Sequence, residues 1–259
     1  MRMGYSAFTR KQYSAALNNF KQALKVRPGD RNAKTAIKNV EIYVSDLKGR
    51  AITFRFSNTG TPSNQFDGAV RRGCLSKKPL VALIPPINPI LAATDYPTLF
   101  FYIPKTSAPE LQFSLLDEVN EKNYQITVTT PKKSGIVSFN FSAIKGLPPL
   151  EIGKDYQWYL SVVCDPENRG GDAVVGGDIR RVELDPVLAE ELKKATPRDR
   201  ASLYAVNSIW FDTLTALYQA RQSSPNNSVL ADEWADILDS VGLKEVAKEP
   251  LLNCCLVKK

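Results

Sequence analysis

The sequence predicts an α+β fold in which helices come first, an antiparallel β-sandwich follows, and a second helical unit ends the chain. Three observations carry this prediction. Apolar residues recur every three or four positions over residues 1–44, they alternate or form short runs over residues 79–184, and helical spacing returns after residue 186. Six or seven strands with no helix between them favour an antiparallel sandwich over an alternating α/β fold.

The first predicted unit, residues 1–48, has small, aromatic and proline residues at the spacing of a helical repeat. These signature positions are Gly4, Ala7, Tyr13, Ala16, Phe20, Ala23 and Pro28. The pattern resembles a tetratricopeptide repeat, and an ordinary amphipathic hairpin is the alternative. Residues 28–30, with the sequence PGD, are expected to end one helix, and residues 31–44 to form the next.

A single repeat of this kind cannot bury its apolar faces alone. The first helix of the pattern is cut short at residue 1, so the segment is expected to stack on missing upstream repeats, on another subunit, or on the rest of the chain. Self-association through the incomplete repeat is one of these expectations.

Residues 49–78 are predicted to be a linker. From residue 57 onward Ser, Thr, Gly, Asn and basic residues dominate, and no hydrophobic period is visible. Residues 50–56 alternate like a short strand, although the same residues would equally end a helix.

The β-sandwich is predicted over residues 79–185. Its strands are expected at residues 79–84, 98–103, 110–117, 123–129, 135–141, 156–164 and 173–184. Leu150, Gly153 and Tyr156 have the spacing of a tyrosine corner, in which a buried tyrosine hydroxyl bonds to the backbone a few residues upstream. The domain therefore resembles immunoglobulin and fibronectin type III domains, which serve mostly as binding and spacer modules.

Residues 186–259 are predicted to form a helical unit packed on the sandwich. Helices are expected at residues 186–195, from residue 197, as a pair across residues 199–222, and at residues 230–241. When Pro28 is superimposed on Pro225, small or aromatic character is kept at most signature positions, so the unit resembles a degenerate tetratricopeptide repeat. The matching positions are Ala201, Tyr204, Trp210, Thr213, Leu217 and Ala220.

The net charge of +7 is unevenly distributed. Residues 1–80 hold 16 Lys or Arg against 4 Asp or Glu, a balance of +12, and residues 81–259 hold 18 against 23, a balance of −5. A basic region of this kind contacts nucleic acid or an anionic membrane in some proteins. A solvated basic helix face is the preferred interpretation, because the aromatic residues that interleave in single-strand binders are missing.

The composition argues against most enzymatic chemistry. The chain has no histidine, which removes the commonest general base and the usual imidazole metal ligand. No glycine-rich phosphate fingerprint is present. We therefore predict no catalytic, cofactor-binding or metal-binding residues and no enzymatic activity; a hydrolase that uses carboxylates alone is the remaining enzymatic alternative.

Two sets of carboxylates come closest to a chemical site. Residues 165–178 hold three Asp and one Glu, but their spacing fits no calcium loop. The acidic pairs at residues 117–118 and 190–191 are expected to be solvated surface charge. The large aromatic residues Trp158, Trp210, Phe211 and Trp234 are expected in the core.

Four cysteines, Cys74, Cys164, Cys254 and Cys255, leave two interpretations open. In an exported protein one or two disulfides are expected, with Cys254 or Cys255 reaching back to Cys74 or Cys164. In a cytosolic protein the four would be free thiols. A zinc site is disfavoured because no Cys-x-x-Cys spacing occurs.

No apolar stretch approaches the ~20 residues of a membrane-spanning helix. The first residues also lack the apolar core and cleavage site of a signal peptide. The chain is thus expected to be cytosolic as written, or to lack an upstream piece.

Several unusual stretches occur in order along the chain. They are RRGC at 71–74, KPLVALIP at 78–85, YPTLFFY at 96–102, YQWYLSVVC at 156–164, ATPRDRA at 195–201 and EPLLNCC at 249–255. Together they resemble the cyanobacterial domain of unknown function 928 family over about residues 70–257. Members often carry signal peptides, so the resemblance implies an extracytoplasmic, periplasmic location, from which this chain departs by its opening helical segment.

The resemblance implies no activity. A non-enzymatic protein-interaction or scaffold module is therefore the predicted function, with a protein or peptide as its partner. The alternative is that the basic N-terminal region binds nucleic acid or an anionic membrane surface.

Overall fold

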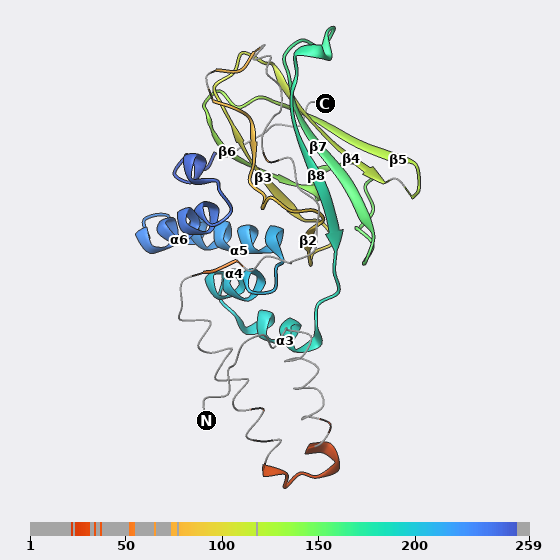
Figure 1. The fold of residues 1–259 in the computed structure, drawn as a ribbon, viewed down its shortest axis with the longest axis vertical. Coiled ribbons are helices and arrows are strands. Elements are labelled where there is room, and N and C mark those ends of the chain that lie inside the picture. The colour runs from red at the N-terminus through yellow and green to blue at the C-terminus, as the bar shows by residue number, and fades with distance from the viewer. Residues whose placement is uncertain are drawn as a thin grey trace.

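The computed structural model describes residues 22, 24–31, 34, 37, 52–54, 65, 74–76, 78–117 and 119–252. Within these residues two β-sheets are followed by four α-helices, so the predicted α+β class is confirmed. Figure 1 shows the strands gathered at one end of the molecule, with the helices below and beside them.

The larger sheet has five strands in the order β2-β8-β7-β4-β5. They are β2 (Ile90–Ala92), β4 (Glu110–Asp117), β5 (Lys122–Thr129), β7 (Asp155–Val163) and β8 (Ala173–Arg181). Neighbouring strands are antiparallel, except that β2 runs parallel to β8. Along β4 buried and half-buried side chains alternate, because only one face of the pleated strand meets the core.

The smaller sheet has three strands in the order β1-β3-β6. They are β1 (Val81–Ala82), β3 (Thr98–Ile103) and β6 (Gly135–Asn140). Strands β3 and β4 begin and end at the predicted residues. Strands β5 and β6 differ from prediction by one residue at one end, β7 by one residue at each end, and β8 ends three residues earlier than predicted. Strand β1 is shorter than predicted, and β2 was not predicted because three residues at a sheet edge are too few to show a period.

The two sheets face each other across an aromatic core. The ring centroids of Phe101 and Trp158 lie 5.6 Å apart in an edge contact, and those of Phe113 and Phe139 lie 5.2 Å apart in a stack. Phe101 and Phe139 belong to the smaller sheet, and Phe113 and Trp158 to the larger one. This arrangement is the sandwich that the strand pattern predicts.

Four α-helices follow the strands. They are α3 (Pro186–Lys194), α4 (Pro197–Ala205), α5 (Trp210–Ser223) and α6 (Ser228–Asp239). Three of them begin after a polar residue whose side chain accepts a hydrogen bond from the first turn, namely Asp185, Thr196 and Asn227. Pro186 and Pro197 then occupy the first helical position, where a missing N–H costs nothing.

The helical unit packs on the face of the smaller sheet that points away from the larger one. Phe100 lies 5.3 Å from Tyr218 and 5.6 Å from Trp234, measured between ring centroids. The Nε1 atom of Trp210 donates a buried hydrogen bond of 2.7 Å to the carbonyl of Leu83. The molecule therefore has three layers, and the core position predicted for the tryptophans is confirmed.

Part of the predicted linker belongs to the core. Ile52 and Phe54 are each only 5% exposed, and the Phe54 ring lies edge-on to Trp210 at 4.7 Å between centroids. No strand covers residues 52–54. The alternating pattern there reflects the burial of every second side chain against the helices, without strand pairing.

Near the N-terminus the predicted helix break is present. Residues 24–26 are helical, residues 27–30 form a turn, and helix resumes at Arg31. In this turn the backbone N–H of Asp30 donates to the carbonyl of Arg27 at 3.0 Å. Of the repeat signature only Pro28 is described; the other six positions lie outside the described residues.

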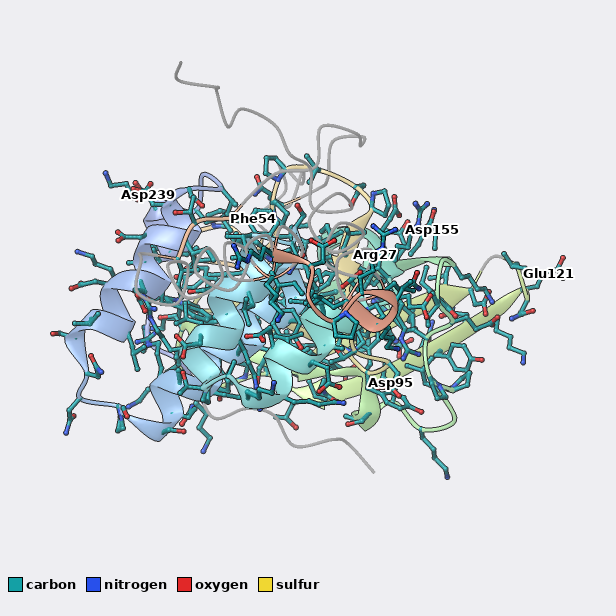
Figure 2. All side chains as sticks on the ribbon, turned by 90° about the horizontal axis from the view of Figure 1, so that it is seen from below. Arg27, Phe54, Asp95, Glu121, Asp155 and Asp239 are labelled. Carbon is teal, nitrogen blue, oxygen red and sulfur yellow. A yellow bond between two sulfur atoms is a disulfide. The ribbon has the colours of Figure 1, made fainter. Side chains whose placement is uncertain are left out.

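Seen from below, the molecule extends from Asp239, at the end of α6, to Glu121, at the turn between β4 and β5 (Figure 2). Helix α6 and the tip of the β4–β5 hairpin thus lie at opposite ends of this view. None of the helices in the described part of the chain is both long enough and apolar enough to cross a membrane.

Candidate functional site

An open pocket of about 320 Å³ lies in the helical unit, where the start of α4, the end of α5 and the start of α6 meet. Its lining combines small polar, apolar and ionic side chains. They are Thr196, Pro197, Arg198, Ala220, Ser223, Ser224, Asn227, Val229, Leu230 and Glu233. This volume is at the small end of the range for ligand sites, so the pocket suits one side chain of a larger ligand.

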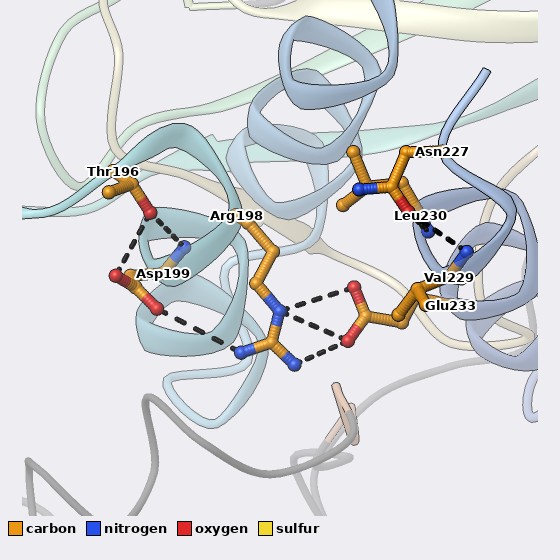
Figure 3. A network of polar contacts seen from close by, with 7 residues as sticks. All are labelled: Thr196, Arg198, Asp199, Asn227, Val229, Leu230 and Glu233. Atoms are coloured by element: carbon orange, nitrogen blue, oxygen red, sulfur yellow. Dashed lines mark hydrogen bonds and ion pairs between the residues drawn. The ribbon is translucent and has the colours of Figure 1, made fainter. Parts of the chain in front are cut away.

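A salt bridge between α4 and α6 forms the ionic part of the pocket. The Nε atom of Arg198 lies 3.0 Å from Oε1 and 3.2 Å from Oε2 of Glu233, and Nη2 also bonds Oε1 (Figure 3). The Glu233 side chain is 7% exposed, whereas that of Arg198 is 24% exposed. The carboxylate is thus buried and multiply bonded, and the guanidinium also lies 3.8 Å from the Asp199 carboxylate.

Capping interactions fix the helix ends at the rim of the pocket. At α4, the Thr196 hydroxyl accepts from the N–H of Asp199 at 3.2 Å and donates to its carboxylate at 2.9 Å. At α6, the Asn227 carboxamide oxygen accepts from the N–H groups of Val229 at 3.0 Å and Leu230 at 3.4 Å (Figure 3). These bonds stabilise the first turns of α4 and α6, which form part of the pocket wall.

The apolar part of the pocket is partly uncovered. Val229 is 60% exposed, one of the few large apolar side chains on the surface of the described residues, while Leu230 and Ala220 behind it are buried. The exposed Val229 offers apolar surface that a ligand would remove from water, and the neighbouring Arg198–Glu233 pair offers polar groups that a ligand could contact. The centres of protein interfaces combine these two properties.

Sequence reasoning missed Arg198 and Glu233. They stand 35 residues apart, and neither has a local pattern that marks it as part of a site. Their meeting depends on the packing of α4 against the α5–α6 pair. The available signal was indirect: Arg198 lies two residues after the capping residue Thr196, and Glu233 lies six residues after the capping residue Asn227.

The tyrosine-corner residues come together as this motif requires. The Tyr156 hydroxyl accepts a hydrogen bond of 3.0 Å from the backbone N–H of Glu151, five residues upstream. Leu150 and Tyr156 are buried, and Gly153 has a φ of +81°, a conformation that disfavours side chains. This contact fixes the connection that leads into β7 and is structural.

The predicted cysteine pairing needs correction. Cys74 and Cys164 form a disulfide, so neither is available to the C-terminal cysteines that were expected to reach back to them. Cys254 and Cys255 lie outside the described residues. Cys164 follows directly on β7, and Cys74 lies beside the connection after β3, which brings two residues 90 apart in sequence to a Cα–Cα distance of 5.3 Å.

The carboxylates of residues 165–178 are engaged in local turn contacts. Asp165 accepts from the N–H of Glu167 at 2.9 Å, and Asp172 accepts from the N–H of Cys164 at 3.0 Å and pairs with Arg169. Within the described residues no three potential metal ligands lie close enough together to hold an ion.

Asp117 is buried, which corrects the expectation of a solvated pair at residues 117–118. Its carboxylate accepts a hydrogen bond from Lys154 at 2.7 Å and from the Asn120 carboxamide at 2.8 Å. Burial alone would raise the pKa of Asp117, but these hydrogen bonds outweigh it and lower the pKa. Glu118 lies outside the described residues, and Glu190 pairs with Lys193 on the exposed face of α3.

Another buried carboxylate, that of Asp212, joins α5 to the loop after β2. It accepts backbone hydrogen bonds from Ala93 at 2.7 Å and Thr94 at 3.2 Å. Burial raises the pKa of Asp212 to about 6, with these bonds opposing the shift in part. Burial, together with the nearby Asp212 carboxylate, raises the pKa of Tyr204 to about 12, and the charge of Arg200 opposes it.

This pKa predicts a pH dependence of stability. The folded chain binds a proton at Asp212 between pH 3.8 and about 6 that the unfolded chain has released, so stability falls as pH rises through this window. The loss corresponds to about 3 kcal/mol. The Asp212→Asn variant keeps the side-chain shape and cannot titrate, so its free energy of unfolding should decline less between pH 4 and 7 in urea titrations. Parallel pH profiles of the two proteins would contradict this assignment.

Comparison with protein-family models matches residues 67–251 to the family described as Domain of Unknown Function (DUF928). The matched range contains both sheets and the four α-helices. No curated protein matches the chain.

Proposed function

The chain belongs to the DUF928 family, and on that premise we propose that it serves as a non-enzymatic protein-interaction module. Its partner is a protein that inserts one side chain of an exposed segment into the pocket between α4, α5 and α6. The observation that carries this proposal is the pocket itself, in which a bidentate Arg198–Glu233 pair lies beside the exposed apolar Val229.

The chemistry of the pocket favours a peptide over a small metabolite. A pocket of about 320 Å³ that is open to solvent surrounds only part of a drug-sized molecule. A peptide segment has an apolar side chain for the space next to Leu230 and backbone groups for the rim. There Ser223, Ser224 and Asn227 offer hydroxyl and carboxamide groups to backbone N–H and C=O.

Two finer structural identities form part of this proposal. The order β1-β3-β6 follows strands A, B and E of an immunoglobulin-type sandwich, and β8-β7-β4-β5 follows strands G, F, C and C′. Tyr156 then stands near the start of strand F, where the corner tyrosine of such domains occurs. The hairpin of α4 and α5, with Ala201 and Trp210 buried, supports a degenerate tetratricopeptide unit as the binding half.

We further propose an extracytoplasmic location. The Cys74–Cys164 disulfide supports it, because such bonds persist in oxidising compartments and are rare in the cytosol. The alternative role, in which the basic N-terminal region binds nucleic acid or anionic lipid, stays a prediction. Nearly all of its residues lie outside the described part of the chain.

Selection from a random peptide library displayed on phage tests the pocket. Peptides enriched on the wild-type chain should bind Val229→Glu and Ser223→Trp at least about tenfold more weakly, because the first adds a charge at the rim and the second fills the space. Binding is measured by calorimetry with the synthetic peptides.

The matched control is Val119→Glu. Val119 is 76% exposed and lies in the β4–β5 hairpin, at the other end of the molecule from α6 (Figure 2). It should leave peptide affinity unchanged. Peptides that bind all three variants equally would place the interaction elsewhere, and failure to enrich any peptide would argue against the proposed function.

A further inference from the structure

The outer edge of the smaller sheet is occupied by the chain's own C-terminal segment. The N–H of Ile136 donates to the carbonyl of Pro250 at 2.7 Å, and the N–H of Leu252 donates to the carbonyl of Ile136 at 2.8 Å. These bonds form a parallel bridge between Ile136 and Leu251, so the segment lies along β6 as an added strand would (Figure 1).

The edge is shaped for this segment. A Cβ atom on Gly135 would lie 2.6 Å from the Pro250 carbonyl oxygen and 2.7 Å from Cγ of Leu252. Real Cβ atoms do not approach other atoms so closely, so the absence of a side chain at Gly135 makes the slot possible. Leu251 and Leu252 are half-buried against the main core.

An ion pair marks the entry to the slot. Lys78 Nζ lies 2.5 Å from Oε1 of Glu249 and 5.7 Å from the centre of the Tyr102 ring. Tyr102 is on β3, next to β6, so the ion pair lies beside the sheet edge that the segment occupies. The positive charge of Lys78 beside the slot is thus complementary to the negative charge of Glu249 on the segment.

The backbone pairing that the structure describes between this segment and β6 is short. Within the described residues its pairing with β6 is confined to Ile136, although β6 continues to Asn140. The segment leaves the 3-10 turn Lys244–Val246 through a single turn bond, from the N–H of Glu249 to the carbonyl of Val246 at 3.1 Å. Release of residues 249–252 requires opening this turn and breaking the two bonds to Ile136 and the Lys78–Glu249 pair, and none of these contacts involves the four α-helices.

We propose that the slot along β6 is a self-association surface, in which residues 249–252 of one copy occupy the slot of a second copy and the exchange is reciprocal. The occupant is a second copy of this chain because the same residues make the same contacts in the partner's slot as in their own. Only the turn at residues 246–249 changes conformation, which is the usual requirement for exchange of a terminal segment. No residue of this slot lines the helical pocket.

Reversal of the ion pair in separate chains tests the exchange. Lys78→Glu and Glu249→Lys each bring like charges together, both within one chain and in a dimer of identical chains. In a mixed dimer with exchanged segments, the introduced glutamate faces the introduced lysine at one slot, and the native Lys78 and Glu249 meet at the other. Both slots of the mixed dimer are therefore complementary.

The two variants are labelled with different isotopes, mixed at high concentration and examined by native mass spectrometry. The ratio of mixed dimer to homodimers is expected to exceed its statistical value by roughly three- to tenfold, as two recovered surface pairs permit, and to return to that value at high salt. The double variant Lys78→Glu/Glu249→Lys should dimerise like wild type. Gly135→Val, which fills the slot, should be monomeric, while its near-ultraviolet circular dichroism shows an intact core.

Three outcomes would overturn the exchange. The first is a wild-type chain that stays monomeric at every concentration. The second is a mixed dimer at its statistical share that Gly135→Val leaves intact, which places association elsewhere. The third combines two results: a chain truncated after residue 248 binds a synthetic peptide of residues 249–259, but the full-length variants never form mixed dimers. The slot would then be a binding site for strands of other proteins.

Discussion

Replacing both Cys74 and Cys164 with alanine is expected to lower the free energy of unfolding by about 4 kcal/mol. The disulfide closes a loop of 90 residues that contains most of both sheets, and it restricts the unfolded chain accordingly. It also acts together with the contacts that hold the segment at residues 74–76 against the chain after β3. Residues 74–76 touch the chain after β3 through backbone bonds such as Ser76 N–H to the Lys105 carbonyl at 2.9 Å.

Urea denaturation measures this loss, and reduction provides the matched control. Dithiothreitol should destabilise the wild-type chain by a similar amount and leave the double alanine variant unchanged. If dithiothreitol destabilises the variant as well, the loss comes from another bond, of which Cys254 and Cys255 are the candidates. Equal stability of the oxidised wild type and the variant would show that the Cys74–Cys164 bond does not constrain the fold.

The pairing of these cysteines illustrates what the sequence does not contain. Four cysteines allow several connectivities, and their spacing carries no information on which ends of strands meet in space. Cys164 comes close to Cys74 only because β7 pairs with β4 and the connection between β3 and β4 runs past the segment at residues 74–76. The pairing of the cysteines therefore follows from the strand topology, which local patterns in one sequence do not specify.

Strands and helices with a regular hydrophobic pattern are predictable, because the spacing of the apolar residues indicates which face of the element is buried. In β4 the alternation of Leu111, Phe113 and Leu115 with polar residues gives both the element and its buried face. The helix starts at Pro186 and Pro197 were equally visible, since each follows a capping residue. These signals lie within a few residues of one another and need no tertiary information.

The candidate site depends on contacts between distant residues, so the sequence could not predict it. Arg198 and Glu233 each look like ordinary solvated helix residues in their local windows. Asp117 looked like surface charge because its partner Lys154 comes from a connection 37 residues further on. The local pattern places Phe54 in a linker, because its burial depends on Trp210 in a helix that forms much later in the chain.

Replacing Trp210 with alanine is expected to lower the free energy of unfolding by about 3–5 kcal/mol. Trp210 is fully buried at the contact between the helical unit and the sandwich. Its ring packs edge-on against Phe54, and its Nε1 atom satisfies the carbonyl of Leu83. The substitution leaves a large cavity and a buried carbonyl without this donor, and both effects weaken the same contact between layers.

Phenylalanine substitutions separate the hydrogen bond from the packing. Trp210→Phe loses ring volume and the bond to Leu83, whereas Trp158→Phe loses similar volume but no hydrogen bond, because the Trp158 Nε1 atom has no partner among the described residues. Both rings are fully buried, so their packing losses are comparable. We expect Trp210→Phe to be the more destabilising by about 1–3 kcal/mol, the cost of a buried acceptor that loses its donor. Equal losses in urea denaturation would show that the contact between the helices and the sandwich depends on shape alone, and that the Leu83 carbonyl finds another donor when the indole is removed.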